Sequence, residues 1–457
     1  MTQCPTLGSV TSSCASILWF RRDLRLGDHP ALLAAASTGR VLPLFVLDPR
    51  LLPRAGAVRR QRLMDSLHAL REQIGGALVV RMGDPVTVVP EVAAAVGARE
   101  VHASRESTPY GRRRDDQVSA ALAQRQIRWV TTGSPYALGP GTVVKDDGEG
   151  YQVFTPFARA WRQHGWPAPA ASAPDVTWAA APSDAELDPP SGAPAGELAA
   201  RERWIAYLED GLAAYARERD LPALDATSRL SPHLKHGEVH PRTLLADIAR
   251  HHDLGAEGPA TFVTELCWRE FYADVLWRHP RSAWADLRPQ LRDLAYDDPG
   301  EDLERWQAGR TGYPIVDAGM RQLLAEGWMH NRLRMITASF FTKDLHLWWP
   351  LGARYFLEQL VDGDLASNNH GWQWVAGTGT DAAPYFRVFN PVTQGEKFDP
   401  DGDYVRRWVP ELAHLPGKAV HQPWKHPAGY EYGYPHRLVD HAEERAETLR
   451  RYEASRR

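Results

Sequence analysis

Short apolar runs alternate with amphipathic stretches through the first 132 residues. Five apolar runs predict buried strands, at residues 16–20, 41–47, 77–80, 100–104 and 127–132. The stretches between them predict helices, at residues 28–37, 58–74, 85–96 and 112–124. This alternation favours a parallel sheet covered by helices on both faces. We therefore expect residues 1–132 to form a Rossmann-like α/β domain with a five-stranded parallel sheet.

Residues 133–197 lose this pattern and become rich in proline, alanine and glycine, above all between 166 and 196. Proline interrupts a helix beyond its first turn, so the segment is expected to be an interdomain connector. It could be a disordered tether. Alternatively, its aromatic residues could hold part of it against the protein surface; these are Tyr151, Phe154, Phe157 and Trp161.

From about residue 198 the apolar residues recur at intervals of three and four, the period of amphipathic helices. The predicted helices are 197–219, 241–253, 259–279, 302–308, 314–326, 330–344 and 353–360. No apolar run there resembles the strands of the first domain, so residues 198–457 are expected to form an all-α domain. The basic end of the chain predicts a solvated helix or a frayed tail.

Composition limits the partners and the location of the protein. A length of 457 residues agrees with two domains. The net charge of −4 gives no general sign of nucleic-acid binding, so a DNA-binding face would be a local basic patch. The three cysteines show neither metal spacing nor a disulfide framework, and no signal peptide or membrane-spanning run is evident. We expect a cytoplasmic protein without a metal site or membrane contact.

Residues 362–374 concentrate unusual chemistry in the sequence DGDLASNNHGWQW. Two carboxylates, two adjacent amides, a histidine and two tryptophans would each need partners in a core helix. The simplest interpretation is a polar loop that enters a tryptophan-rich helix. Trp372 and Trp374 are two residues apart, about 200° around a helix, so they are predicted to face opposite ways.

Three other segments accompany this one: WFRRDLRLGDHPAL at 19–32, RTGYPIVDAGMRQLLAEGWMHNRLRMITASFFTKD at 310–344 and GTGTDAAPYFRVFNPVTQGEKFDPDGDYVRRWVP at 377–410. Together they closely resemble the DNA photolyase/cryptochrome family of blue-light flavoproteins, from about residue 16 to about residue 430. The resemblance is greatest to class I cyclobutane pyrimidine dimer photolyases. It implies a monomer that binds reduced FAD in the helical domain and UV-damaged DNA, single- or double-stranded, and that splits the dimer by electron transfer from excited FAD.

The segment ATSRLSPHL at 226–234 places hydroxyl groups before a helical pattern, which suits either a plain helix cap or a phosphate. The resemblance implies that it cradles the FAD diphosphate. It also implies that Arg334 pairs with Asp362, that Asp364 accepts from the flavin ring, and that Asn368 faces flavin N5. The full set of implied FAD contacts is Tyr215, Thr227, Ser228, Arg229, Leu230, Ser231, Phe262, Asn331, Arg334, Asp362, Asp364 and Asn368; Phe262 stands where bacterial relatives carry Trp.

Glu265, Trp268 and Arg269 share one helix face, because they lie at i, i+3 and i+4. They could be a surface Glu–Arg pair over a packed tryptophan. The resemblance instead implies that Glu265 contacts the dimer carbonyls and that Trp268 packs on the dimer. The implied DNA and lesion contacts are Arg219, Glu265, Trp268, Arg269, Asn331, Arg332, Met335, Trp374 and Arg387.

The resemblance also implies an electron-transfer chain that begins at Trp372 and continues through Trp349. Its third position, usually Trp, aligns by spacing with Tyr296, which is harder to oxidise unless its phenolic proton can leave. Nearby tryptophans could substitute for it; these are Trp284, Trp306 and Trp348.

Residues 107–115, STPYGRRRD, resemble the matching segment of deazaflavin-type photolyases, which favours an 8-hydroxy-5-deazaflavin antenna over methenyltetrahydrofolate. The alternative is a turn with a basic helix start. Three other functions stay open: a cryptochrome photoreceptor, a (6-4) photolyase, for which His330 and His370 are the histidines to consider, and a light-independent FAD oxidoreductase. The last would need a nicotinamide fingerprint, and the sequence shows none.

Overall fold

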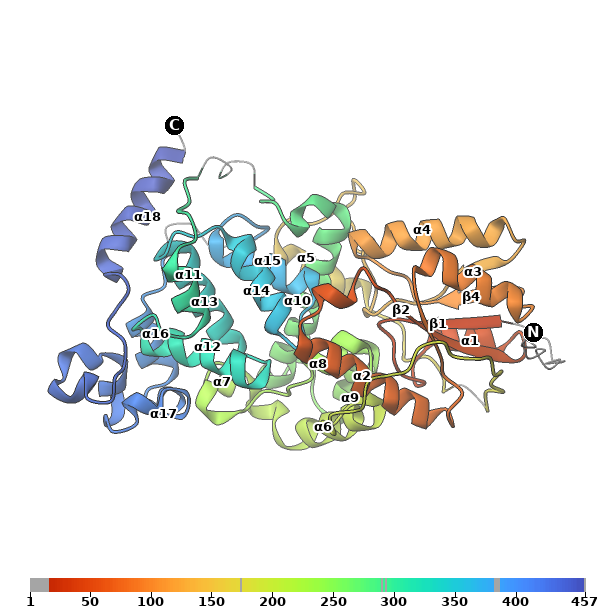
Figure 1. Ribbon diagram of the computed structural model, residues 1–457, viewed down its shortest axis with the longest axis horizontal. Coiled ribbons are helices and arrows are strands. Elements are labelled where there is room, and N and C mark those ends of the chain that lie inside the picture. The colour runs from red at the N-terminus through yellow and green to blue at the C-terminus, as the bar shows by residue number, and fades with distance from the viewer. Residues whose placement is uncertain (1–15, 173–174, 289–290, 292–293, 382–386, 456–457) are drawn as a thin grey trace, which may run out of the picture.

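The computed structural model describes residues 16–172, 175–288, 291, 294–381 and 387–455. The molecule is elongated in the view of Figure 1, with an α/β domain at the N-terminal end and a helical domain at the other. This arrangement confirms the fold class predicted from the sequence.

The N-terminal domain is built on a five-stranded parallel sheet. Its strands, in the spatial order β3-β2-β1-β4-β5, are β1 (Ser16–Phe20), β2 (Val41–Leu47), β3 (Val79–Met82), β4 (Glu100–Ala103) and β5 (Arg128–Thr131). The central strands β1 and β2 are buried along their whole length, as expected for apolar runs covered on both faces. Ser16 pairs with Val41 on one side and with Glu100 on the other, which sets the register.

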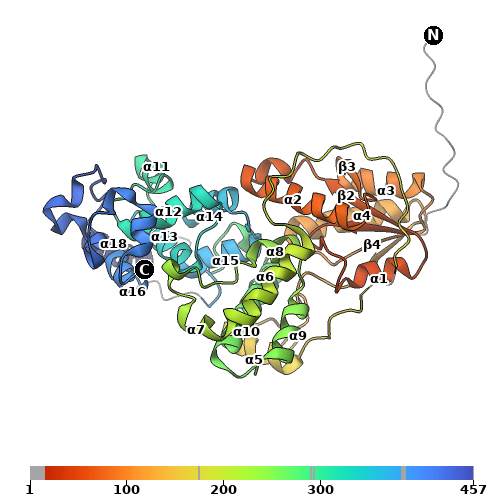
Figure 2. The same cartoon turned by 90° about the horizontal axis from the view of Figure 1, so that it is seen from below.

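Two pairs of helices cover the sheet. One face packs against α1 (Pro30–Ala36) and α2 (Ala57–Gln73), through residues such as Leu32 and Leu67. The opposite face packs against α3 (Pro85–Ala95) and α4 (Pro109–Ala123), through residues such as Val89 and Val118. Figure 2, seen from below, places these helices around the strands.

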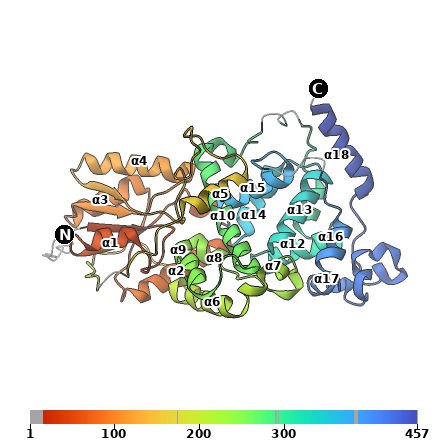
Figure 3. The ribbon, with the colours of Figure 1, turned by 180° about the vertical axis from the view of Figure 1, so that it is seen from behind.

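The connector is attached to both domains. It contains α5 (Phe154–His164), whose Phe157 and Trp161 join the core beneath α10 (Glu257–Arg278). Further along, Trp178 forms a parallel bridge with Val41 at the sheet. Figure 3 shows α5 beside α10 from behind. The aromatic residues of the connector therefore pack into the protein, as one of the two sequence interpretations anticipated.

The C-terminal part is helical, and no strand occurs among its described residues. Besides α10 its helices are α6 (Gly196–Asp210), α7 (Tyr215–Glu218), α8 (Ser231–His236), α9 (Pro241–His251), α11 (Glu301–Gln307), α12 (Pro314–Glu326), α13 (Asn331–Lys343), α14 (Trp349–Gln359), α15 (Leu365–Ala376), α16 (Pro391–Phe398), α17 (Asp403–Trp408) and α18 (His441–Ser455). Short 3₁₀ turns lie at Leu52–Arg54, Leu212–Ala214, Pro222–Leu224, Pro280–Ala283, Pro410–Leu412, Gly417–His421, Pro423–Lys425 and Pro427–Tyr430.

One predicted helix, 197–219, is interrupted. The structure ends α6 at Asp210 and continues through a 3₁₀ turn into α7, with Gly211 at the break. Glycine stabilises a helix less than other residues do, which favours an end at this position. The C-terminal segment is helical as α18, which agrees with the solvated-helix alternative.

Buried ion pairs tie the two domains together. Glu238, which precedes α9, accepts from Arg62 of α2, from His233 Nδ1 at 2.5 Å and from the Gly196 amide at 2.8 Å. Burial alone would raise the pKa of Glu238, but His233 and Arg62 lower it to about 2. Because removing one partner from a buried pair leaves an uncompensated charge, these contacts fix how the domains pack.

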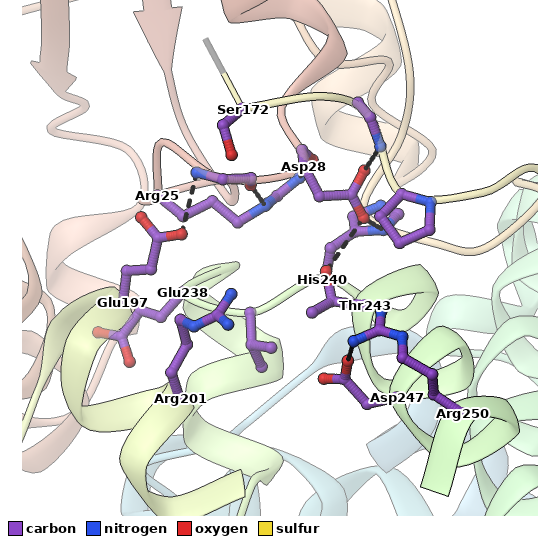
Figure 4. Close-up of a pocket in the computed structure, with 14 residues that line it drawn as sticks. Arg25, Asp28, Ser172, Glu197, Arg201, Glu238, His240, Thr243, Asp247 and Arg250 are labelled. Carbon is purple, nitrogen blue, oxygen red and sulfur yellow. Dashed lines mark hydrogen bonds and ion pairs between the residues drawn. The ribbon is translucent and has the colours of Figure 1, made fainter. Parts of the chain in front are cut away.

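A polar cavity of about 180 Å³ lies where the loop after β1, the connector and helices α6 and α9 meet (Figure 4). Its acidic groups already have donors. Asp28 accepts from the Ala170 amide at 2.7 Å and lies 2.9 Å from His240 Nδ1, while Asp247 pairs with Arg250 at 3.2 Å. We interpret the cavity as part of the domain interface.

Candidate functional site

The loop before α15 carries two carboxylates, Asp362 and Asp364, which lie two residues apart and have different partners. Arg334, on α13, donates from Nη2 to Asp362 Oδ2 at 2.9 Å and from Nε to the Met329 carbonyl at 2.8 Å. Asp362 is 6% exposed, and its second oxygen, Oδ1, is buried without a partner in the described part of the chain. A buried, unpaired carboxylate oxygen is costly, so it is suited to a ligand that donates a hydrogen bond.

Asp364 caps α15, since its Oδ1 accepts from the Ser367 amide at 3.1 Å. Its Oδ2 lies 2.6 Å from Arg22 Nη2, in the loop after β1, and 3.9 Å from Lys235 Nζ on α8. Burial alone would raise the pKa of Asp364, but Arg22 and Lys235 hold it well below its usual value. Asp364 is therefore a permanent anion that links the two domains.

Asn368 lies one turn into α15. Its Nδ2 donates both to the Ala353 carbonyl at 3.0 Å and to Asn369 Oδ1 at 2.9 Å. Both amide hydrogens are therefore used, and the side-chain carbonyl is the group left to accept from a ligand. Gly371, three residues further on, shares this helix face, and a Cβ added to it would meet open space.

The segment 227–231 leads into α8. Thr227 Oγ1 is buried without a partner in the described chain. Arg229 adopts a left-handed backbone (φ 51°), and its guanidinium lies 3.9 Å above the Trp328 ring. Arg229 also pairs with Asp225 at 2.7 Å and with Glu326 at 3.1 Å, so its charge is neutralised internally.

The remaining groups around this segment are aromatic and polar. Ser231 Oγ accepts from Trp328 Nε1 at 3.4 Å, and Leu230 is buried. Ser228 supplies its carbonyl to Arg203 Nε at 2.9 Å. Tyr215 and Phe262 lie with their ring centres 5.3 Å apart and join the same core, so they form an apolar wall.

On α10, Glu265 and Trp268 have partners from two other segments. Glu265 Oε1 lies 2.6 Å from Arg219 Nη1. The Trp268 ring is stacked on Phe154 of α5, with the ring centres 3.6 Å apart and the planes 7° from parallel. Arg269 donates to the Pro135 carbonyl at 2.8 Å and to the Leu234 carbonyl at 3.2 Å, so it does not form the surface pair with Glu265 that the i, i+4 spacing allowed.

The first turn of α13 presents three candidate residues. Asn331 is exposed, and its Nδ2 lies 4.0 Å from Met335 Sδ. Arg332 pairs through Nη2 with Asp220 at 2.6 Å and lies over the Phe398 ring at 4.4 Å. Asp220 was not singled out from the sequence, although it directly follows Arg219.

The tryptophans of this domain differ in burial. Trp372 is 3% exposed and packs against Trp306, whose ring centre is 6.1 Å away, whereas Trp374 is half-buried. Trp349 is fully buried and donates from Nε1 to Asp286 Oδ1 at 2.6 Å. Tyr296 is half-buried near the C-terminal helix. Trp284 and Trp348 are each more than one-third exposed, and Trp306 is completely buried.

The last two predicted features are Arg387 and the segment 107–115. Arg387 is exposed, with its guanidinium 5.8 Å from the Phe389 ring. In the segment 107–115, Thr108 caps α4 by accepting from the Gly111 amide at 3.2 Å, and the buried Arg114 pairs with Asp115 at 2.8 Å. These contacts make the segment a capped helix start. No cluster able to hold a metal ion and no helix able to cross a membrane occurs in the described part of the chain.

Comparisons with known proteins agree with this architecture. The FAD binding domain of DNA photolyase matches residues 262–454, and the DNA photolyase domain matches residues 16–175. The deoxyribodipyrimidine photo-lyase of Escherichia coli strain K12 is 41% identical over 480 aligned residues, covering 96% of this chain and 98% of that protein. That of Streptomyces griseus is 42% identical, covering 94% of this chain and 97% of that protein.

Solved structures give the same result. A class III photolyase from Agrobacterium tumefaciens superimposes with a TM-score of 0.88 at 36% identity and covers 99% of both chains. A cryptochrome from Synechocystis sp. PCC6803 gives 0.87 at 27% identity, covering 95% of this chain and 98% of that one. An α/β domain followed by this helical domain defines a two-domain flavoprotein with FAD as its cofactor. The chain belongs to the DNA photolyase family.

Proposed function

We propose that this chain uses light to split cyclobutane pyrimidine dimers in DNA, which makes it a carbon–carbon lyase of DNA repair. The observation that carries the proposal is the match, over nearly the whole chain, to proteins named deoxyribodipyrimidine photo-lyase. Its geometry supports the same activity, because α10 presents Glu265 and Trp268 while packing against α15, which carries Asn368. Bound reduced FAD supplies, when excited, the electron that opens the dimer.

The described residues fit FAD. Thr227 Oγ1 and Asp362 Oδ1 are buried and unpaired, and Gly371 leaves open space on the Asn368 face. Arg334 and Asp364 would fix the polar edge of the ring, with Asn331 at its rim, and Tyr215 and Phe262 would form the apolar wall. The residues that would hold the diphosphate are Thr227, Ser228, Arg229, Leu230 and Ser231.

Asn368 would set the protonation of the flavin. Its amide hydrogens are bound to protein acceptors, so its carbonyl can accept from flavin N5 but cannot give it a proton. A neutral amide therefore brings no proton to N5, whereas the carboxylic acid of an aspartate at this position could. The variant Asn368→Asp should accumulate the neutral radical on illumination, which absorption spectroscopy detects; an unchanged spectrum would contradict this role.

The lesion would be bound outside the DNA stack, because a dimer pairs and stacks poorly and so is extruded at lower cost than a normal base. Trp268 and Trp374 are half-buried, so each can present ring surface to it. Glu265 is the hydrogen-bonding group: as a carboxylate it would accept from an N–H group of the pyrimidine rings, and with a proton it would donate to their carbonyls, where it would stabilise developing negative charge. Asn331 and Met335 would complete the wall from α13.

Phosphate contacts would position the DNA and make binding weaken with salt. Arg387 is exposed, and Arg219 and Arg332 are partly exposed at 19% each. Arg269 is directed toward two carbonyl groups, so a phosphate contact there would require those bonds to break.

Electrons would reach the flavin through Trp372 and Trp349. A further donor would be either Tyr296, after Trp349, or Trp306, which packs directly on Trp372. Replacing each in turn by Phe separates the two: the true donor is the one whose loss slows flavin photoreduction, measured by transient absorption.

The antenna, the oligomeric state and the location extend this proposal. The resemblance of residues 107–115 supports an 8-hydroxy-5-deazaflavin antenna, and chromophore extraction followed by absorption spectroscopy identifies it. The protein would act as a cytoplasmic monomer; the buried, free Cys267 fits a reducing compartment, and light scattering measures the mass.

The decisive experiment uses anaerobic, photoreduced protein and a single-stranded oligonucleotide that carries one cyclobutane thymine dimer. Dimer loss under blue light but not in the dark is expected. Glu265→Ala should lower the yield of repair per absorbed photon roughly tenfold, because a strong hydrogen bond in the transition state is lost. Absence of repair by fully reduced, FAD-loaded protein would overturn the proposal.

A further inference from the structure

Four charged side chains of alternating sign form a network across the lesion-facing surface. Arg219 Nη1 lies 2.6 Å from Glu265 Oε1, and Arg219 Nε lies 3.9 Å from Asp220 Oδ1. Arg332 Nη2 lies 2.6 Å from Asp220 Oδ2. Asp220 is thus shared by two arginines, one of which holds Glu265. The network joins the end of α7 to α10 and α13.

Aromatic rings pack against the two arginines of the network, and all four charged side chains are partly exposed to solvent. The Arg219 guanidinium lies 5.3 Å from the Tyr215 ring centre, and that of Arg332 lies 4.4 Å from the Phe398 ring centre. The arginine side chains are 19% exposed and the two carboxylates 34%. Ion pairs with this much exposure contribute up to about 1 kcal/mol, so a phosphate can compete for them.

Glu265 is already bound to Arg219 within this network. In the ion pair with Arg219 it is an ionised acceptor whose charge is already neutralised, and its Oε1 is occupied. We propose that Asp220 is a positioning residue that couples phosphate binding at Arg332 to the release of Glu265 from Arg219. The inference rests on the function proposed above, and it assigns a role to a residue outside the proposed FAD and lesion contacts.

The coupling follows from the alternation of negative and positive side chains along the network. A DNA phosphate at Arg332 replaces Asp220 as the partner of that guanidinium. Asp220 is then left with Arg219 alone, and the 3.9 Å separation between them can shorten by side-chain rotation. As Arg219 turns toward Asp220, the Glu265 carboxylate becomes free to accept from an N–H group of the dimer. The lesion contact is therefore made only when the DNA backbone is in place.

The test uses flavin-loaded wild type and Asp220→Asn. Dissociation constants for undamaged and dimer-containing oligonucleotides are measured in the dark, and the repair quantum yield at saturating DNA is measured under blue light. Asp220→Asn should bind undamaged DNA roughly two- to fivefold more tightly, because phosphate no longer displaces a carboxylate from Arg332. Its repair yield should fall by a similar factor, because nothing draws Arg219 away from Glu265.

Opposite changes in affinity and yield distinguish this role from a structural one, which would weaken both. Circular dichroism and flavin content check folding, and Asp220→Glu, which keeps the charge, should restore the wild-type yield. The matched control is Glu411→Gln, which removes another partly exposed carboxylate, 2.7 Å from Arg321, and should change neither quantity. The inference is wrong if Asp220→Asn weakens binding or leaves the yield unchanged. If the wild type itself repairs no dimer, the proposed function fails first, and the inference fails with it.

Discussion

Lys235 is the lysine of the positive cluster around Asp364, and Lys235→Met should stabilise the protein in a pH-dependent way. Burial, followed by repulsion from Arg22, lowers the Lys235 pKa from 10.5 to about 7, although Asp364 attracts it from 3.9 Å. That difference corresponds to about 5 kcal/mol. Between pH 7 and pH 10.5 Lys235 is mostly protonated in the unfolded chain and mostly neutral in the folded one. The contribution of this group to the free energy of unfolding of the wild type therefore rises by about 1.4 kcal/mol per pH unit.

Methionine keeps the apolar stem of the side chain and cannot titrate. The free energy of unfolding of Lys235→Met should therefore exceed that of the wild type by at most about 5 kcal/mol at pH 7, and by less than about 1 kcal/mol at pH 10. Urea denaturation followed by circular dichroism at four pH values, with matched flavin content, measures this. Lys418→Met, at an exposed position, is the control. A difference that does not change with pH would refute the reasoning.

Four further predictions concern α14, α15 and DNA binding. Burial lowers the His370 pKa to about 3, so stability should be lost as the pH falls from 6.5 toward 3, by about 1.4 kcal/mol per unit; urea midpoints of His370→Gln should show a weaker loss. A Cβ at Gly352 would overlap the Trp372 ring, so Gly352→Ala should cost about 1–3 kcal/mol in thermal unfolding. Gly371→Ala should stabilise its helix by about 1 kcal/mol yet weaken FAD binding roughly tenfold, measured by flavin fluorescence; unchanged affinity would exclude this face. Arg332→Gln should lower the salt dependence of DNA binding by about one ion, and an unchanged slope would remove it from the phosphate contacts.

Much of the fold could be predicted, because its signal is periodic. The strand at 41–47 and the helix at 314–326 were predicted with the bounds that the structure shows, since continuous burial and a proline at the helix start leave little freedom. Helices α8, α16 and α17 were not predicted. Each is eight residues or shorter, so few periodic positions exist, and tertiary packing decides whether they form.

Only those residues of the candidate site that lie within contiguous sequence motifs could be predicted. The Arg334–Asp362 pair followed from resemblance, and the structure places these groups 2.9 Å apart. The partners of Asp364 could not be found in the same way. Arg22 lies 342 positions earlier, and its contact depends on how two domains pack, which leaves no local pattern. Asp220 was missed for a related reason, since its importance comes from two arginines that only the tertiary fold brings to it.

The stack of Phe154 on Trp268 bears on how such proteins can be recombined. Phe154 belongs to the connector, yet its ring lies against the tryptophan proposed to meet the lesion. A chimera that exchanges the α/β domain together with residues 133–197 would therefore carry a foreign surface into the substrate pocket. A crossover placed just after β5 would keep the connector with its own helical domain, and parents joined there should inherit damage recognition and light harvesting as separate traits.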